Sequence, residues 1–149
     1  MGIIIALKGV TNSGKSMTFR MLHDKFFLHK KSGYTQIPKK YEEHGEKDFL
    51  NIFEKNKKKI GITSAGDTSG IVSKGLIKLI NYEKCEIIIC TCHPWGGGKT
   101  VKAIFKYRDH YLRFIQKNKR KNTESIDESN EKYAIELFKE VEELVNLPK

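Results

Sequence analysis

Residues 9 to 16 read Gly9-Val10-Thr11-Asn12-Ser13-Gly14-Lys15-Ser16 and match the pattern G-x-x-x-x-G-K-[ST] at every constrained position. The apolar run Ile3–Leu7 before them is rich in β-branched residues, which is typical of a buried parallel strand. After them, Phe19, Leu22 and Phe26 recur with the spacing of one helix face. A strand, a glycine loop and a helix in this order predict a phosphate-binding site rather than a chance match.

The residue types in this stretch suit a phosphate ligand. Gly9 and Gly14 have no Cβ, so the backbone can turn sharply and bring successive N–H groups close to phosphate oxygens. The helix that begins near Gly14 points its unpaired N–H groups and its positive dipole end at the same anion. In this pattern the Lys15 ammonium reaches the β- and γ-phosphates, and the Ser16 hydroxyl binds Mg²⁺.

Through these eight residues the chain resembles the P-loop NTPases. The resemblance implies a bound nucleoside triphosphate with magnesium, with Lys15 as a catalytic residue and Ser16 as the metal ligand. The residues implied to contact the nucleotide are Gly9, Thr11, Asn12, Ser13, Gly14, Lys15, Ser16 and Met17.

Length and composition indicate a folded single domain. The chain has 149 residues, of which 38% are hydrophobic and 31% charged, so we expect one nucleotide-binding domain over residues 1–149. No apolar run is long enough to cross a bilayer, and the chain enters a strand without a basic leader. These features predict a cytoplasmic protein with no membrane partner.

The three cysteines allow two interpretations. Cys85, Cys90 and Cys92 are an odd number, which is typical of reduced thiols in a cytosol. The stretch Cys90–His93 fits either a zinc site or plain core packing. Packing is favoured, because Cys90 and Cys92 share one face of a strand and no second ligand cluster is visible.

The net charge of +10 also has two interpretations. Lysines gather at residues 30–31, 39–40, 55–59 and 117–121, which indicates either solvated loops or attraction to polyphosphate or nucleic acid. No nucleic-acid motif is present, so solvated loops are favoured and nucleic acid remains an alternative partner.

Residues 30–47 hold two glycines and a proline without a sustained period. We expect a long loop here, with at most a short strand at Tyr34–Ile37, and we expect it to act as a switch or a substrate-binding segment. Its lysines would attract a bound polyphosphate. Three carboxylates in or beside this segment could approach magnesium, namely Glu42, Glu43 and Asp48.

The rest of the chain alternates between strand and helix signals. Residues 48–53 and 58–63 flank a polar turn and predict a β-hairpin, which a helix with an apolar face over residues 72–80 follows. Residues 86–92 predict a second buried strand. The remaining predictions are a short helix at 99–108, an edge strand at 111–115 and a final helix that begins with the capping box Ser125–Glu128.

This order of elements resembles the kinase–GTPase branch of the P-loop folds. The resemblance implies an antiparallel second strand and a third strand that carries an acidic group facing the γ-phosphate. It makes Asp67 the candidate catalytic residue that positions water or magnesium, although Ser64 stands where the GTPase pattern has an aspartate. A plain helix cap is the alternative role for Asp67.

The loop 93–100 contains three successive glycines and Trp95. The glycines would let the backbone approach a nucleotide and Trp95 could stack on a base, or the segment is a plain turn with a surface tryptophan. No Asn-Lys-x-Asp motif follows the strand at 86–92, which favours ATP over GTP. Arg108 is the arginine best placed for a phosphate or base contact.

We therefore expect a three-layer α/β P-loop domain whose mostly parallel sheet has about five strands, one of them antiparallel. The expected function is magnesium-dependent binding and hydrolysis of a nucleoside triphosphate, with ATP favoured. We expect this hydrolase to act alone, with a protein partner or with further copies of itself. A small kinase that moves the γ-phosphoryl group to an acceptor is the alternative. A third interpretation is a nucleotide-dependent binding module that does not hydrolyse.

Overall fold

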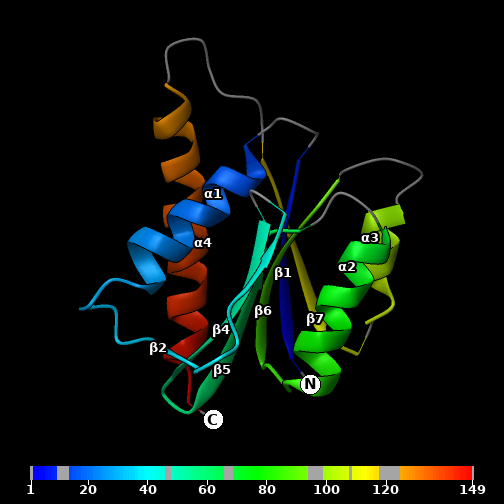
Figure 1. The fold of residues 1–149 in the computed structure, drawn as a ribbon, viewed down its shortest axis with the longest axis horizontal. Coiled ribbons are helices and arrows are strands. Elements are labelled where there is room, and N and C mark those ends of the chain that lie inside the picture. The colour runs from blue at the N-terminus through cyan, green and yellow to red at the C-terminus, as the bar shows by residue number, and fades with distance from the viewer. Residues whose placement is uncertain are drawn as a thin grey trace.

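The computed structural model describes residues 2–9, 14–45, 48–65, 69–93, 99–107, 109–117 and 125–148. These residues form an α/β fold around one mixed sheet of seven strands in the order β2-β4-β5-β6-β1-β7, with β3 paired to β4 (Figure 1). The strands are β1 (Ile3–Lys8), β2 (Thr35–Gln36), β3 (Glu42–His44), β4 (Asp48–Lys55), β5 (Lys58–Thr63), β6 (Ile87–Cys92) and β7 (Tyr111–Gln116).

The strands β5, β6, β1 and β7 are parallel neighbours, whereas β4 runs antiparallel to β5 and to the short strands β2 and β3. The mostly parallel sheet and its single strand of opposite direction are confirmed. The predicted number of about five strands is too low, because β2 and β3 lie in the segment 30–47 that we expected to be mainly loop. Strand β3 has no apolar alternation, and Gly45 with a φ of 71° follows it directly.

Helices cover both faces of the sheet, as Figure 1 shows. Helix α1 (Lys15–Met21) continues into the wider π-type turns of η1 (Leu22–Phe27) and shares one face with α4 (Ile126–Val145). Helix α2 (Ser69–Leu76), which continues into η2 (Ile77–Tyr82), and helix α3 (Lys99–Phe105) cover the other face. None of these helices is long and apolar enough to cross a membrane.

Strand alternation divides the apolar core between the two faces. In β1, Ile5 and Leu7 pack with α1, η1 and α4, whereas Ile4 and Ala6 pack with α2 and α3. Because successive side chains of a strand point to opposite faces, an apolar run such as Ile3–Leu7 belongs in a strand that is covered on both sides. The buried parallel strand predicted from this run is confirmed.

Two local predictions are also confirmed. The hairpin of β4 and β5 turns at Asn56 and Lys57, which both have positive φ, at 53° and 64°. The side chain of Ser125 accepts a hydrogen bond from the Glu128 N–H at 3.0 Å and so caps the first turn of α4.

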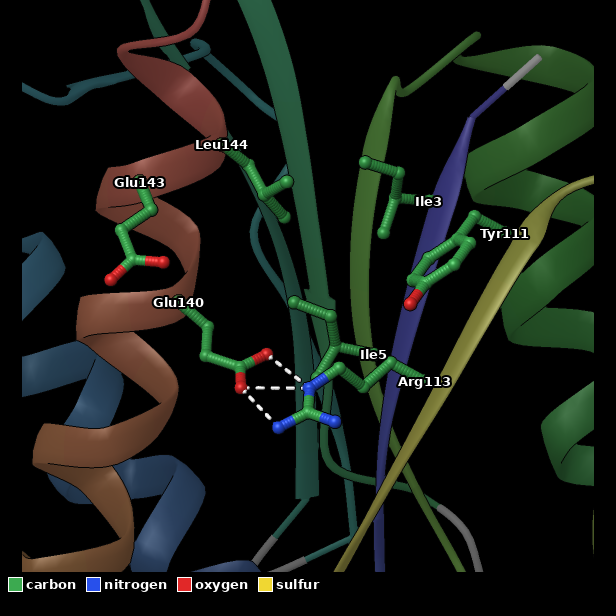
Figure 2. A pocket seen from close by; sticks show the side chains of 7 residues that line it. All are labelled: Ile3, Ile5, Tyr111, Arg113, Glu140, Glu143 and Leu144. Carbon is green, nitrogen blue, oxygen red and sulfur yellow. Dashed lines mark hydrogen bonds and ion pairs between the residues drawn. The ribbon is translucent and has the colours of Figure 1, made fainter.

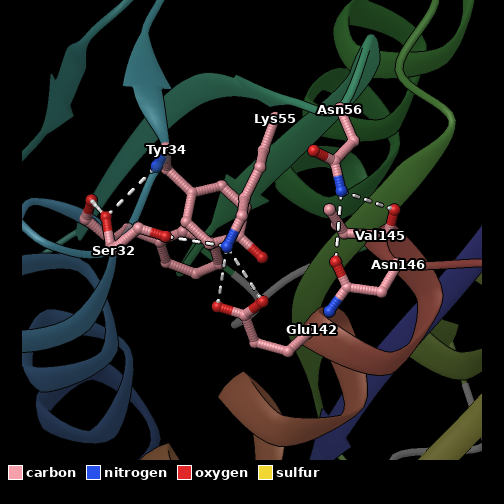
Figure 3. Close-up of polar contacts among 8 residues, drawn as sticks. Ser32, Tyr34, Lys55, Asn56, Glu142, Val145 and Asn146 are labelled. Atoms are coloured by element: carbon pink, nitrogen blue, oxygen red, sulfur yellow. Dashed lines mark hydrogen bonds and ion pairs between the residues drawn. The ribbon is translucent and has the colours of Figure 1, made fainter.

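The edge of the sheet at the amino ends of the parallel strands is held by contacts within the chain (Figure 3). The Lys55 ammonium donates to the carbonyl of Ser32 at 2.8 Å and pairs with Glu142 of α4 at 3.1 Å. The buried Lys58 ammonium donates to the carbonyls of Leu144 and Leu147 at 2.8 and 2.6 Å. A cation at the carboxyl end of α4 is favoured by the negative end of the helix dipole.

Candidate functional site

The carboxyl ends of β1 and β6 mark a switch in the direction of the chain. Helix α1 follows β1 on one face of the sheet, whereas α3 follows β6, the neighbouring strand, on the opposite face. The two strand ends are joined where the Gly9 N–H donates to the carbonyl of Cys92 at 3.1 Å. In open α/β sheets, ligands bind in the crevice outside such a switch point.

Gly14 and Lys15 of the predicted phosphate loop lie at this edge. Gly14 precedes α1 with a φ of 91°, a left-handed conformation that favours glycine. A Cβ at this position would lie 2.5 Å from Oδ1 of Asn130 in α4, so the site has no room for a side chain. The buried Lys15 ammonium donates to the Gly9 carbonyl at 2.5 Å.

Ser16 lies in a small polar cluster with two residues that are distant in sequence. The hydroxyls of Ser16 and Ser64 donate to the same oxygen, Oδ1 of Asp48, at 3.0 and 3.1 Å. Ser64 follows β5 and is itself fixed, because its hydroxyl accepts from the Phe49 N–H at 3.0 Å and its carbonyl accepts from Thr91 at 2.8 Å. Three separate segments thus bring a carboxylate beside the serine that was predicted to bind magnesium.

Of the other carboxylates predicted to approach magnesium, neither joins this cluster. Glu42 forms an ion pair with Lys78 of η2, and Glu43 accepts a hydrogen bond from the Tyr41 hydroxyl at 3.3 Å. Among the described contacts, neither carboxylate binds Ser16, whereas Asp48 contacts it directly.

The remaining predicted site residues divide into two groups. Met17 is 50% exposed, so its side chain is not part of the packed interior. The other predictions lie outside the described residues, namely Thr11, Asn12, Ser13, Asp67, Trp95, the glycines of 96–98 and Arg108.

The strand that the kinase–GTPase resemblance assigns to the acidic group is not beside β1. Strand β6 lies between β1 and β5, so the end of β5 is about 10 Å away across two strand spacings. The nearer strand end carries His93, whose N–H donates to the Thr100 hydroxyl of α3 at 3.0 Å.

Two buried polar residues near the loop were not predicted. Asn130 of α4 accepts from the Thr18 hydroxyl at 3.3 Å and so joins α4 to α1. Lys117 follows β7, donates its backbone N–H to the Lys8 carbonyl at 2.6 Å and places its ammonium 4.7 Å from the centre of the Tyr133 ring. The sequence near Asn130 does not indicate a site residue, because Asn130 is one polar residue among others in the first turns of a helix. Lys117 was noted only as a member of a lysine cluster.

All three cysteines are buried in the core beside α2 and α3. Burial raises the pKa of Cys85 to about 12 and that of Cys92 to about 11, so both remain protonated thiols near neutral pH. Because zinc binds the thiolate, this environment fits the packing interpretation.

Two cavities lie at different ends of the sheet. One, of about 340 Å³, lies between α2 and β3, β4 and β5, and includes Glu42, His44, Leu50, Ala65, Lys74 and Lys78 in its lining. The other, of about 280 Å³, lies at the starts of β1 and β7 beneath α4 (Figure 2). In the second cavity, the Arg113 guanidinium is paired with Glu140 at 2.7 Å, as Figure 2 shows.

Comparisons with protein-family models, with curated proteins and with solved structures find no match for this chain. The evidence for function is therefore the motif and the geometry around it.

Proposed function

We propose that this protein binds a nucleoside triphosphate with Mg²⁺ at the carboxyl edge of the sheet and hydrolyses it, with ATP as the favoured substrate. The observation that carries the proposal is the geometry of the described residues of the G-x-x-x-x-G-K-S stretch, Gly9 and Gly14–Ser16. Gly14 adopts a left-handed conformation, Lys15 donates to the Gly9 carbonyl, and both lie at the switch point between β1 and β6.

The residues at this edge suit the phosphates of such a ligand. The Lys15 ammonium donates to the Gly9 carbonyl, and it would exchange that carbonyl for the β- and γ-phosphate oxygens. A charge-assisted contact with phosphate is stronger than one with a neutral carbonyl, so the exchange is favourable.

The donor set also fits magnesium. Mg²⁺ prefers oxygen ligands and usually combines one or two carboxylates with substrate phosphates and water. Ser16 offers a hydroxyl oxygen and Asp48 a carboxylate within one hydrogen-bonded cluster. When bound, the metal would neutralise the charge that develops on the phosphates during transfer. Asp67 stays our proposed residue for positioning the attacking water.

The cavity beside this edge favours the kinase as a second candidate. Its lining includes Leu50, two residues after Asp48 in β4, and Thr63 and Ala65, which precede and follow Ser64. Lys74 and Lys78 of α2 and η2 also line it, and within the described part of the chain only Lys78 has an ion-pair partner. A cavity with a free ammonium and an apolar wall suits a small anionic acceptor.

Phosphate release separates these candidates. Hydrolysis predicts that the protein releases phosphate from ATP with magnesium alone, and that Lys15→Ala does not. Release only in the presence of a small anionic acceptor, with the phosphorylated acceptor as product, would favour the kinase. Tight nucleotide binding without release under either condition would favour the binding module.

A displacement titration tests the choice of base. ATP should displace a fluorescent nucleotide at lower concentrations than GTP, because the sequence carries no guanine-reading motif. A clear preference for GTP would reverse the choice of substrate and leave the phosphate site in place.

A further inference from the structure

The carboxylate of Asp48 has an unusual set of partners. One oxygen, Oδ1, accepts from the Ser16 and Ser64 hydroxyls at 3.0 and 3.1 Å. In the part of the chain that the structure describes, no donor contacts Oδ2 and no cation lies within ion-pair distance of Asp48. Two neutral hydroxyls therefore stabilise the carboxylate charge through Oδ1. The lone pairs of Oδ2 remain available to accept further hydrogen bonds.

The strand order explains how Asp48 reaches this edge. Strand β4 is antiparallel to β5, so its first residue lies at the edge where the parallel strands end. Ser64, which follows β5, binds Asp48 through its side chain and Phe49 through its backbone N–H at 3.0 Å. The position where the GTPase pattern has an aspartate is thus occupied by a serine, and that serine holds a carboxylate supplied by the neighbouring strand.

The hydrogen bond from Ser16 to Asp48 also fixes the direction of the serine hydroxyl. A hydroxyl has one hydrogen and two lone pairs, and here the hydrogen points at Asp48. Both lone pairs of Ser16 are then free to face a cation on the other side. Groups behind a metal ligand that orient it in this way contribute strongly to metal affinity.

We infer that Asp48 is the acidic residue of the magnesium site, where it positions the Ser16 hydroxyl through Oδ1 and accepts a hydrogen bond from a metal-bound water through Oδ2. This inference rests on the proposed function, because the nucleotide supplies the other magnesium ligands. It assigns to Asp48 of β4 the magnesium-positioning role for which the sequence offered Asp67, and it leaves Asp67 as the proposed residue for positioning the attacking water. Asp48 is a positioning residue, since it acts through Ser16 and water.

The test is Asp48→Asn, because an asparagine oxygen still accepts both serine hydroxyls while the negative charge is lost. Calorimetry with a non-hydrolysable ATP analogue, at increasing Mg²⁺ and in excess EDTA, measures the metal dependence of binding. We expect the half-saturating Mg²⁺ concentration to rise by about tenfold to 100-fold, the usual cost of removing an outer-shell partner. Binding in EDTA should be unchanged or tighter, because a negative charge near the phosphates is removed.

Three further variants sharpen the result. Ser16→Ala should raise the Mg²⁺ requirement in the same way, and Ser64→Ala should raise it less, because Asp48 then keeps one of its two hydroxyl partners. Asp67→Asn makes the same change at the other candidate aspartate and should leave the Mg²⁺ requirement unchanged. Electron paramagnetic resonance of Mn²⁺ with the analogue gives a second readout, in which Asp48→Asn should leave more free Mn²⁺.

The outcomes separate this inference from the proposed function. If the unaltered protein binds the analogue with a clear Mg²⁺ dependence that Asp48→Asn does not change, or that only Asp67→Asn changes, the inference about Asp48 is wrong and the proposed function stands. Equal losses with Mg²⁺ and in EDTA would mean that Asp48 is merely structural, which also overturns the inference. If the unaltered protein does not bind the analogue, the proposed function fails and the inference fails with it.

Discussion

The two edges of the sheet use charged residues differently. At the amino ends of the parallel strands, Lys55 is paired with Glu142 (Figure 3), and Lys58 donates to two carbonyls at the end of α4. At the carboxyl ends, Lys15 donates to the Gly9 carbonyl, and among the described residues Asp48 accepts hydrogen bonds from two serine hydroxyls. At the amino edge the charged residues join α4 to the β4–β5 hairpin. At the carboxyl edge, phosphate would complement the charge of Lys15, and a metal ion would complement that of Asp48.

This difference gives a physical criterion for separating structural from functional charges. A charge that is paired or caps a helix contributes to the free energy of unfolding, and its removal leaves a buried partner unsatisfied. A charge that faces a ligand contributes mainly to binding. The following predictions apply this criterion to one edge at a time, in order of decreasing effect.

Lys58→Ala should have the largest effect on stability. The variant loses two hydrogen bonds from a buried ammonium to the carboxyl end of α4, which predicts a decrease of about 2 to 3 kcal/mol in the free energy of unfolding. Urea denaturation measures this decrease. The affinity for magnesium and ATP should not change.

Lys139→Ala is the matched control, since Lys139 is an exposed lysine of α4, the helix whose carboxyl end Lys58 contacts. Its free energy of unfolding should stay within about 0.5 kcal/mol of the original. A loss of nucleotide affinity in Lys58→Ala, with stability preserved, would contradict the division between the two edges.

Gly14→Ala should affect both stability and binding. An alanine at a φ of 91° is strained, and its Cβ would meet the Asn130 side chain, so we expect a loss of about 1 to 2 kcal/mol together with weaker nucleotide binding. Thermal unfolding and a nucleotide titration of the same sample measure the two effects. Gly70→Ala is the control, because among the described residues no atom outside its chain neighbours and its own helix backbone lies within 4 Å of a Cβ at that position, and it should be neutral or slightly stabilising.

His23 should make stability dependent on pH. Burial lowers its pKa, and its Nε2 accepts from the Asn51 amide at 3.0 Å, so protonation would place two donors against each other. The unfolded chain therefore takes up a proton at higher pH than the folded protein, and stability should fall as the pH decreases through about 6.5. Asp24 and Arg20 act on the same ring with opposite signs.

Urea denaturation between about pH 7 and about pH 5 measures this dependence. His23→Gln keeps an acceptor for Asn51 and removes the titrating group, so its stability should decrease less over that range. His29→Gln, at an exposed position, should keep the full dependence. Equal slopes for the original protein and His23→Gln would show that other groups cause the loss.

Tyr34→Phe should have the smallest effect, with the opposite sign. Among the described residues, the Tyr34 hydroxyl is the buried side-chain group without a hydrogen-bond partner, and its burial raises its pKa. Removing an unsatisfied buried hydroxyl predicts a stabilisation of about 1 kcal/mol, which differential scanning calorimetry can detect. A destabilised Tyr34→Phe would mean that the Tyr34 hydroxyl has a hydrogen-bond partner in the folded protein.

The features that sequence predicts well depend on local residues. The left-handed Gly14, the capping Ser125 and the hairpin turn at Asn56 each follow from a short pattern of residue types. The apolar runs of β1 and β6 likewise required strands covered on both faces.

The features that sequence misses depend on strand order. Nothing in the chain near Asp48 indicates that it meets Ser16, because that contact needs β4 antiparallel to β5 and Ser64 between them. The kinase–GTPase resemblance therefore favoured Asp67, which follows the expected strand. The sequence indicated Asp48 only as one of three carboxylates that could approach magnesium. The short strand β3 was missed because pairing with β4, and not its own composition, makes it a strand.

Calorimetry of Lys15→Ala with magnesium and ATP tests most directly that the carboxyl edge is the ligand edge. We predict that the variant stays folded, with a free energy of unfolding within about 1 kcal/mol of the original, because its side chain donates to the Gly9 carbonyl and its loss removes a modest hydrogen bond. Its affinity for ATP should fall by at least about 100-fold, which corresponds to roughly 3 kcal/mol. Unchanged affinity in the folded variant would contradict the central claim.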